Sequence, residues 1–274
     1  MKFGFLVKEY DSYSRGIANQ IIEYFEEENH FVKEFERNEI IKDVDIVVVC
    51  GGDGTILGAA NYCGEIPIFG INTGTLGFLS SDVDTEAIYP EMETVLNRIV
   101  KKDYQIDVRN RLLAKIIRQD KEIHSFTALN DIVIKGAAAK LIKLKVYIEN
   151  RFVGNFPGDG LIISSATGST AYNSSAGGPI IEPGVPANVI TPICPHVLGV
   201  RPLVVFDVQP IRVIVDSYHK QLIASADGQY DFDLCVDDEV VICSSRTEIT
   251  KFIQFNDPLN FFDNLRKKLK WGRE

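Results

Sequence analysis

The stretch VDIVVVCGGDGT, residues 44–55, decides the fold. Its first seven residues are β-branched and almost continuously apolar, which is typical of a central strand in a parallel sheet that is buried on both faces. Three glycines and an aspartate follow at once, and residues 55–63 can form a short helix. In an open α/β sheet, ligands bind beyond the carboxyl ends of the strands. We therefore expect a binding site where this strand ends.

The residues on both sides of this stretch alternate between strand and helix patterns. Apolar runs predict strands at 2–7, 31–35 and 66–71, and apolar residues at helical spacing predict helices at 14–28 and 85–100. This alternation indicates an α/β sheet with right-handed crossovers.

The pattern changes near residue 108. Short β-rich runs follow one another from there, and only residues 170–177 suggest a helix, which predicts a mostly antiparallel β domain. Residues 257–270 again have helical spacing, and we expect this C-terminal helix to return and pack near the first domain.

The composition excludes several classes of protein. Lysine and arginine number 29 against 38 aspartates and glutamates, a net charge of −9, so the basic footprint of a general nucleic-acid binder is missing. No apolar run approaches the ~18–20 residues of a membrane helix. The five cysteines, several of them in apolar runs, predict reduced, buried thiols in a cytoplasmic protein. The four histidines lack the spacing of metal ligands.

The glycine-rich turn at 51–55 suits an anion, because backbone N–H groups at a helix N-terminus attract phosphate. Asp53 would repel that phosphate unless it holds Mg²⁺ or takes a proton from an attacking hydroxyl. An ordinary Gly-Asp-Gly turn is one alternative. A Rossmann dehydrogenase is another, but its ribose-binding acid would fall near Asn72, which is no carboxylate.

Four further segments are rich in polar groups. NTGTLGF (72–78) ends the next strand at the same sheet edge, where Phe78 can supply an apolar wall, although alone it is more often a plain turn. Residues 158–179 are dense in glycines and hydroxyls and contain Tyr172, which suits a polar ligand with a flat base. A serine-rich loop is the alternative there. LND (129–131) and DGQ (227–229) are typical of turns, and their side chains can equally form hydrogen bonds with ribose hydroxyls.

Taken together, these segments resemble the NAD kinase family. The matching pieces, in the family's order, are GGDGT (51–55), NTGTLGF (72–78), LND (129–131), DGLIISSATGSTAYNSSAGGPI (159–180), TPICPH (191–196) followed by RP (201–202), and DGQ (227–229). The chain departs from the family at Ala166, where proline is usual, and at Pro157, where many members carry an arginine that can contact phosphate.

The resemblance implies transfer of the terminal phosphoryl group of ATP, or of polyphosphate, to the 2′-hydroxyl of the adenosine ribose of NAD, with Mg²⁺ or another divalent cation. It implies an α/β nucleotide-binding domain at 1–104, with 255–274 packing back on it, and a β-rich NAD-binding domain at 105–254. It also implies a homodimer or homotetramer with the NAD site near the subunit interface. A lipid or sugar kinase sharing the GGDGT turn and a non-catalytic NAD-binding sensor are the alternatives.

The resemblance also assigns roles to residues. Asp53 would be the general base and lie near Mg²⁺, which no direct protein cage would hold, and Asp159 would reach a neighbouring subunit's ligand. The residues expected to bind phosphate are Gly51, Gly52, Gly54 and Thr55. The residues expected to bind NAD are Asp53, Gly54, Phe78, Asn130, Asp131, Lys140, Asp159, Thr167, Thr170, Ala171, Tyr172, Asn173, Ser174, Ser175 and Gln229.

Overall fold

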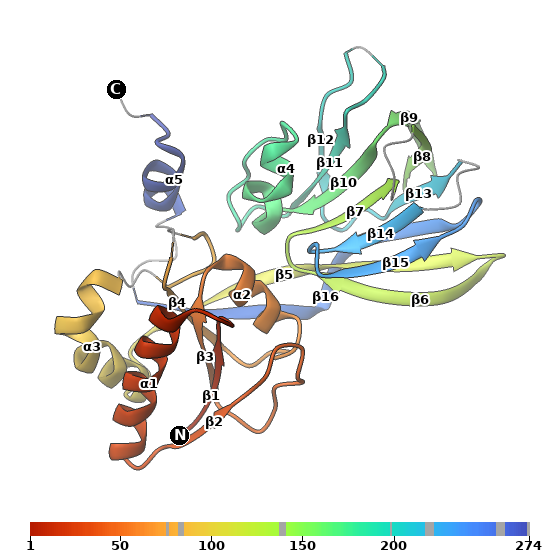
Figure 1. Ribbon diagram of the computed structural model, residues 1–274. Coiled ribbons are helices and arrows are strands. Elements are labelled where there is room, and N and C mark those ends of the chain that lie inside the picture. Colours follow the sequence, from red (N-terminus) through yellow and green to blue (C-terminus); the bar gives the residue numbers. More distant parts are fainter. Residues whose placement is uncertain are drawn as a thin grey trace. The chain divides into compact units, whose positions relative to one another are not determined.

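The fold is that of a computed structural model, shown in Figure 1. It describes residues 1–74, 77–81, 85–136, 141–197, 199–216, 222–255 and 261–272, with the side chains of 85–91 left aside. The chain forms two compact units. The first comprises residues 1–108 and 250–274, and the second comprises residues 109–249.

The first unit is built on a parallel sheet. Its strands run in the order β2 (Phe31–Glu34), β1 (Lys2–Val7), β3 (Ile46–Gly51) and β4 (Ile68–Asn72). The end of β16 (Glu239–Gln254) adds a parallel strand beside β4. Every residue of β3 is buried, as the apolar run predicted for a central strand. The α/β prediction for this part of the chain is confirmed.

Helices cover both faces of this sheet (Figure 1). One apolar cluster joins Phe25 of α1 (Ser12–Glu27) and Leu96 of α3 (Thr85–Val100) to Phe69 of β4 and to alternate residues of β1 and β3. The neighbouring residue Gly70 faces the other way. A Cβ at Gly70 would lie 2.7 Å from Ile56 Cδ1, so α2 (Asp53–Ala60) packs closely on the opposite face.

The C-terminal segment returns to the first unit, as predicted. Arg98 donates to the carbonyl of Phe255 at 3.3 Å, and its guanidinium lies 4.7 Å from the centre of the Phe255 ring. Helix α5 (Phe261–Leu269) follows, with Leu265 buried. Residues 257–260 of the predicted helix lie outside the part of the chain that the structure describes.

The second unit contains antiparallel strands in two sheets (Figure 1). One sheet contains β16, β13 (Ile211–Val215), β8 (Ile142–Ile148) and β9 (Arg151–Gly158), with β5 (Gln105–Arg118) and β6 (Lys121–Ala128) off this path. The other runs in the order β12 (Leu203–Phe206), β11 (Ala187–Ile193), β10 (Gly160–Ser165), β7 (Asp131–Gly136), β14 (Leu222–Ala226) and β15 (Tyr230–Leu234). A single buried cluster of aliphatic side chains draws on both sheets, so the core of the unit lies between them.

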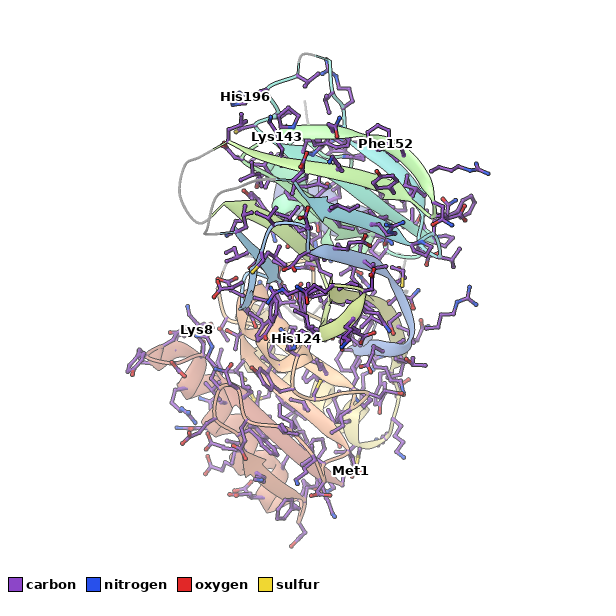
Figure 2. The ribbon with its side chains drawn as sticks, turned by 90° about the vertical axis from the view of Figure 1, so that its right-hand side faces the viewer. Met1, Lys8, His124, Lys143, Phe152 and His196 are labelled. Carbon is purple, nitrogen blue, oxygen red and sulfur yellow. The ribbon has the colours of Figure 1, made fainter. Side chains whose placement is uncertain are left out.

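Three local expectations need correction. Strands β6 and β11 were not anticipated, and the helix expected at 170–177 is a 3₁₀ turn, η1 (Thr167–Thr170), followed by the single turn α4 (Tyr172–Ser175). Only one of the eight residues of strand β6 is buried, and aromatic stacking contributes to the position of the strand. The ring of His124, labelled in Figure 2, lies 4.8 Å from that of Phe232. Its Nε2 is 2.8 Å from the Tyr230 hydroxyl.

The expectation that the cysteines are buried was right for only some of the five. Cys50 and Cys63 are buried, and burial raises the pKa of the Cys50 thiol to about 12. Cys194 and Cys235 are exposed, because both lie beyond the apolar cores, Cys194 in a turn with φ 44°. Within the described residues, no helix combines the length and the apolar character that crossing a membrane requires.

Candidate active site

Two glycine-rich turns begin at neighbouring strand ends in the first unit. Strands β3 and β4 pair in parallel with Gly51 opposite Asn72, so the turns that follow them leave the same edge of the sheet. Gly52 caps α2 and Asp53 is the first residue of that helix. The two turns that were predicted to share a ligand because they follow parallel strands are therefore adjacent in space.

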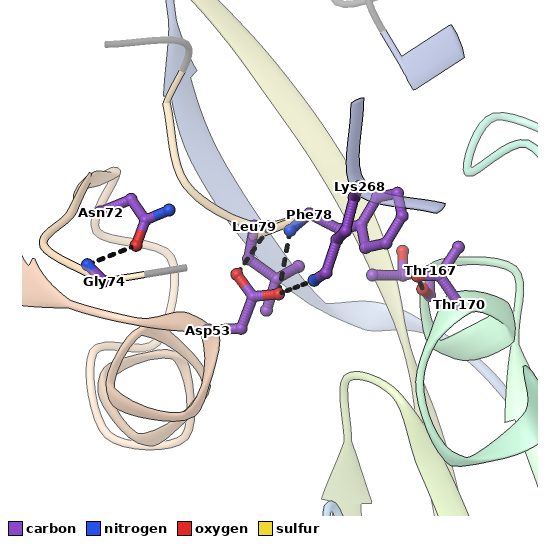
Figure 3. Close-up of polar contacts among 8 residues, drawn as sticks. All are labelled: Asp53, Asn72, Gly74, Phe78, Leu79, Thr167, Thr170 and Lys268. Atoms are coloured by element: carbon purple, nitrogen blue, oxygen red, sulfur yellow. Dashed lines mark hydrogen bonds and ion pairs between the residues drawn. The ribbon is translucent and has the colours of Figure 1, made fainter. Parts of the chain in front are cut away.

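The Asp53 carboxylate bridges the two turns, as Figure 3 shows. Its Oδ2 accepts from the backbone N–H of Phe78 at 2.9 Å, and its Oδ1 accepts from that of Leu79 at 3.2 Å. The ammonium of Lys268, on α5, lies 3.3 Å from Oδ2. The side chain of Asp53 nevertheless stays 33% exposed, so the carboxylate is fixed in place and open to a reactant.

The glycines around Asp53 serve different purposes. A Cβ at Gly77 would overlap Asp53 Oδ1, and a Cβ at Gly51 would overlap the Thr55 hydroxyl, so packing within the protein accounts for these two glycines. At Gly52 and Gly54 a Cβ would meet nothing within 4 Å. These two positions leave open space over the turn where the sequence predicts a phosphate.

The second turn is shaped by Asn72, whose side-chain oxygen accepts from the N–H of Gly74 at 3.0 Å. Asn72 is buried, so this internal bond orders the loop beside the carboxylate. The Phe78 ring is half-buried, with its centre 4.3 Å from the Lys268 ammonium and 6.3 Å from the ring of Phe261. Thr75 and Leu76 of this motif lie outside the described residues.

In the second unit, the LND and DGQ motifs meet. The carboxylate of Asp227 accepts three backbone N–H groups, from Leu129 at 2.8 Å, Asn130 at 2.7 Å and Asp131 at 3.2 Å. In return, the N–H of Asp227 donates to the carbonyl of Asp131 at 3.0 Å. The predicted DGQ turn is the hairpin between β14 and β15, and its aspartate holds the LND turn.

The glycine- and hydroxyl-rich segment joins the same group. Ser165 donates through its hydroxyl to the carbonyl of Leu129 at 2.6 Å and through its N–H to the carbonyl of Asn130 at 2.9 Å. The N–H of Gly168 donates to the Ser165 hydroxyl at 3.0 Å. A Cβ at Gly168 would overlap the Asn130 carbonyl. Three motifs that are far apart in sequence thus form one hydrogen-bonded cluster.

This cluster contains two carboxyl groups that resist ionisation. Burial first, and the charge of Asp227 second, raise the pKa of Asp131 to about 7, while Lys135 opposes the shift. Burial likewise raises the pKa of Asp227, against the effect of its N–H donors and of Arg111. Gln229 lies exposed at the tip of the same hairpin.

The predicted lining residues of η1 and α4 divide into exposed and buried side chains. Tyr172 is 43% exposed and Ser175 is exposed, whereas Thr167 is buried and accepts from Arg109 at 3.4 Å. Asn173 is fully buried, and its amide bonds to the carbonyls at 169 and 179 and to the Thr191 hydroxyl. Asn173 thus holds this loop in place through buried hydrogen bonds, and its contact with NAD stays a prediction.

The remaining predicted residues are placed as follows. Thr170, Ala171 and Ser174 lie on the same short helical segment and are half-buried. Asp159 is exposed between β9 and β10, and its hydrogen bond raises the pKa of the Cys194 thiol. Lys140 lies outside the described residues.

Sequence reasoning missed two residues that the structure brings to these sites. Asp227 was expected to form a hairpin turn or to bind ribose hydroxyls, not to hold the LND turn, and Lys268 was not singled out. Lys268 did leave a signal, because RKKLK at 266–270 gathers four cations in an acidic chain.

A parallel α/β sheet whose strand ends hold a glycine-rich turn and a fixed carboxylate suits a nucleotide-dependent phosphotransferase. Residues 8–104 match the family model of the ATP-NAD kinase N-terminal domain, and residues 129–255 match that of the ATP-NAD kinase C-terminal domain. The chain belongs to the NAD kinase family, whose members are phosphotransferases with an alcohol group as acceptor. The family resemblance found in the sequence is confirmed.

Relatives and solved structures agree with this membership. The chain is 42% identical over 262 residues to an NAD kinase of Solibacter usitatus, covering 94% of this chain and 88% of the relative. It is 38% identical to an NAD kinase of Geotalea daltonii, covering 99% of both. Yeast NADH kinase complexed with NADH superimposes with a TM-score of 0.89 at 25% identity, covering 100% of this chain and 89% of the other. An NAD kinase from Archaeoglobus fulgidus in complex with ATP gives 0.79 at 30% identity, covering 98% and 99%.

Proposed function

We propose that this chain transfers the terminal phosphoryl group of ATP to the 2′-hydroxyl of the adenosine ribose of NAD, with Asp53 as the general base. The observation that carries the proposal is the Asp53 carboxylate, which two backbone N–H groups fix at a sheet edge beside the open space over Gly52 and Gly54 (Figure 3). A ribose hydroxyl is a poor nucleophile at neutral pH and needs such a base within hydrogen-bond reach.

In the reaction, the proton of the hydroxyl passes to the Asp53 carboxylate. The ribose oxygen forms a bond to the terminal phosphorus, and the bond from that phosphorus to the leaving ADP oxygen breaks. The carboxylate needs no rearrangement to receive the proton, because Phe78 and Leu79 already fix its plane. Such fixed orientation is the main protein contribution in phosphoryl transfer.

A divalent cation fits this site as a companion of the nucleotide. Among the described residues, no group of three or more histidines, cysteines, aspartates or glutamates surrounds a common point. Mg²⁺ is usually bound by one or two carboxylates together with substrate phosphates and water. Asp53 is the carboxylate beside the expected phosphates, so we propose that a cation bound by those phosphates lies near it and neutralises their charge.

For the second unit, we propose the NAD subsite. The LND turn, the DGQ hairpin and the segment 167–175 share one hydrogen-bonded cluster, so a ligand that contacts one of them meets the others. The exposed ring of Tyr172 is available to stack on a flat base.

A homo-oligomer is part of the proposal. Strand β12 lies at the edge of its sheet and exposes apolar side chains, with Phe206 67% exposed. An exposed apolar edge favours pairing with a second chain. Light scattering of the wild type and of Phe206→Asp tests this, because a monomeric wild type would refute it.

The decisive assay measures NADP after incubation with NAD, ATP and Mg²⁺. Replacing ATP by polyphosphate identifies the donor, and a lipid or sugar kinase or a non-catalytic sensor would form no NADP. Asp53→Asn keeps the shape of the side chain, and turnover should fall by roughly 10²–10⁴-fold, the usual effect of losing a general base. Asp103→Asn is the matched control, since it removes an exposed, ion-paired carboxylate from the same unit. Near-normal NADP formation by Asp53→Asn would overturn the assignment.

A further inference from the structure

The last turn of α5 is the most basic segment of an otherwise acidic chain. Arg266, Lys267 and Lys268 lie in this turn and Lys270 follows it, in a chain of net charge −9. Leu265 of this helix is buried, and the C-terminal segment belongs to the first unit. This segment therefore presents positive charge beside the glycine-rich turns where phosphates are expected.

One of these cations reaches the candidate base. The Lys268 ammonium lies 3.3 Å from Asp53 Oδ2 and 4.3 Å from the centre of the Phe78 ring (Figure 3). A carboxylate and the face of an aromatic ring are both favourable partners for an ammonium. The side chain of Lys268 remains 32% exposed, and four rotatable bonds connect the ammonium to the backbone, so it can leave this position without moving the helix.

Stability does not account for this ion pair, because pairs at exposed positions add little to folding. The pair also opposes the proposed chemistry if it persists. The ammonium occupies the position beside Oδ2 that a substrate hydroxyl would need, so Lys268 must withdraw before that hydroxyl can reach the carboxylate. Incoming phosphate groups carry more negative charge than the carboxylate and attract the ammonium away from it.

We propose that Lys268 is a catalytic residue of the phosphoryl transfer. It pairs with Asp53 before the substrates bind, and it contacts the transferred phosphoryl group during the reaction, which releases the Asp53 carboxylate to take the hydroxyl proton. The proposal rests on the function proposed above. The sequence analysis predicted only backbone N–H groups and a metal as partners of the phosphates, and Lys268 would be a further cation in this site.

The test compares Lys268→Met with Lys268→Arg and with Lys267→Met. Lys267 has the same charge one position earlier, and adjacent residues on a helix face different directions. We expect Lys268→Met to lower kcat by about 10²-fold, the usual effect of removing one group that stabilises charge in the transition state. The KM for NAD should stay within about twofold, Lys268→Arg should recover most of the loss, and Lys267→Met should behave as the wild type. Unchanged melting temperatures would exclude a folding defect.

A double-mutant cycle separates contact with phosphate from mere support of Asp53. If Lys268 contacts the phosphoryl group, adding Lys268→Met to Asp53→Asn should cost a further loss of about tenfold or more. If the double variant equals Asp53→Asn, Lys268 acts only through Asp53 and the proposed contact is overturned. Equal activity of Lys268→Met and Lys267→Met would overturn it as well. If the wild type is active and Asp53→Asn is strongly impaired, either of these negative results for Lys268 leaves the proposed function intact. A wild type that forms no NADP would instead overturn the proposed function itself.

Discussion

Replacing Asp131 by asparagine should make the protein more stable at alkaline pH. Asp131 begins β7, is 5% exposed, and lies close enough to Asp227 for their charges to repel. Burial and this repulsion raise its pKa from 3.8 to about 7. The buried carboxyl group is therefore more readily protonated in the folded chain than in the unfolded chain.

The sign of the effect follows from that difference. Between about pH 4 and pH 7 the folded protein holds a proton that the unfolded chain has released, so the free energy of unfolding falls as the pH rises through this window. The pKa difference is 7 − 3.8 = 3.2. At about 1.36 kcal/mol per pKa unit, the full cost of the ionised group above pH 7 is at most roughly 4 kcal/mol. Asparagine carries no charge and avoids this cost.

Urea unfolding followed by circular dichroism, at intervals from pH 4.5 to 8.5 without ligands, measures the effect. The difference in unfolding free energy between Asp131→Asn and the wild type should grow with pH and level off above pH 7. Asp233→Asn, at an exposed position on β15 of the same sheet, is the control and should run parallel to the wild type. If the unfolding free energy of Asp131→Asn changes with pH in the same way as that of the wild type, the carboxyl group of Asp131 does not have a raised pKa.

Two further variants test the candidate site. Gly77→Ala should displace the Asp53 carboxylate, since a Cβ there overlaps Oδ1, and should reduce NADP formation by about 10²-fold, the scale of a small misplacement of a catalytic group. Gly74→Ala, where a Cβ meets nothing within 4 Å, should retain activity, and equal rates for the two would contradict the geometric argument. Tyr172→Ala should raise the KM for NAD by about tenfold at nearly constant kcat, as expected for a lost base-stacking contact. An unchanged KM together with lower thermal stability would instead make Tyr172 a packing residue.

Much of the first unit could be predicted because its signals are local. The apolar run before Gly51 marks a buried strand, and the rule for parallel sheets then brings the turns at Asp53 and Phe78 to one edge. Strand β11 escaped prediction because Pro192 interrupts its apolar run, and β6 because only one of its residues, Ala128, is buried. In both cases pairing with neighbouring strands, rather than local propensity, decides the structure.

The contacts that complete the sites could not be predicted in the same way. Lys268 and Asp53 are 215 residues apart, and no periodicity connects them. The three N–H bonds to Asp227 likewise depend on how β7 and β14 pair, which the sequence of the turn does not reveal. Side-chain bonds between distant segments follow from the fold, so sequence patterns can nominate such residues without showing what each one touches.

Strand β16 has a consequence for the synthesis of the protein. It begins in the second unit and ends in the first, where Ile253 enters the apolar cluster and its carbonyl accepts from the Ser81 hydroxyl at 2.6 Å. A ribosome that has finished residue 108 must add residues 109–249 before the end of this strand is made, which takes roughly 7–28 s at about 5–20 residues per second. Throughout that interval the nascent sheet lacks its β16 partner beside β4, so the amino-terminal part of the chain is translated first and completes its folding last.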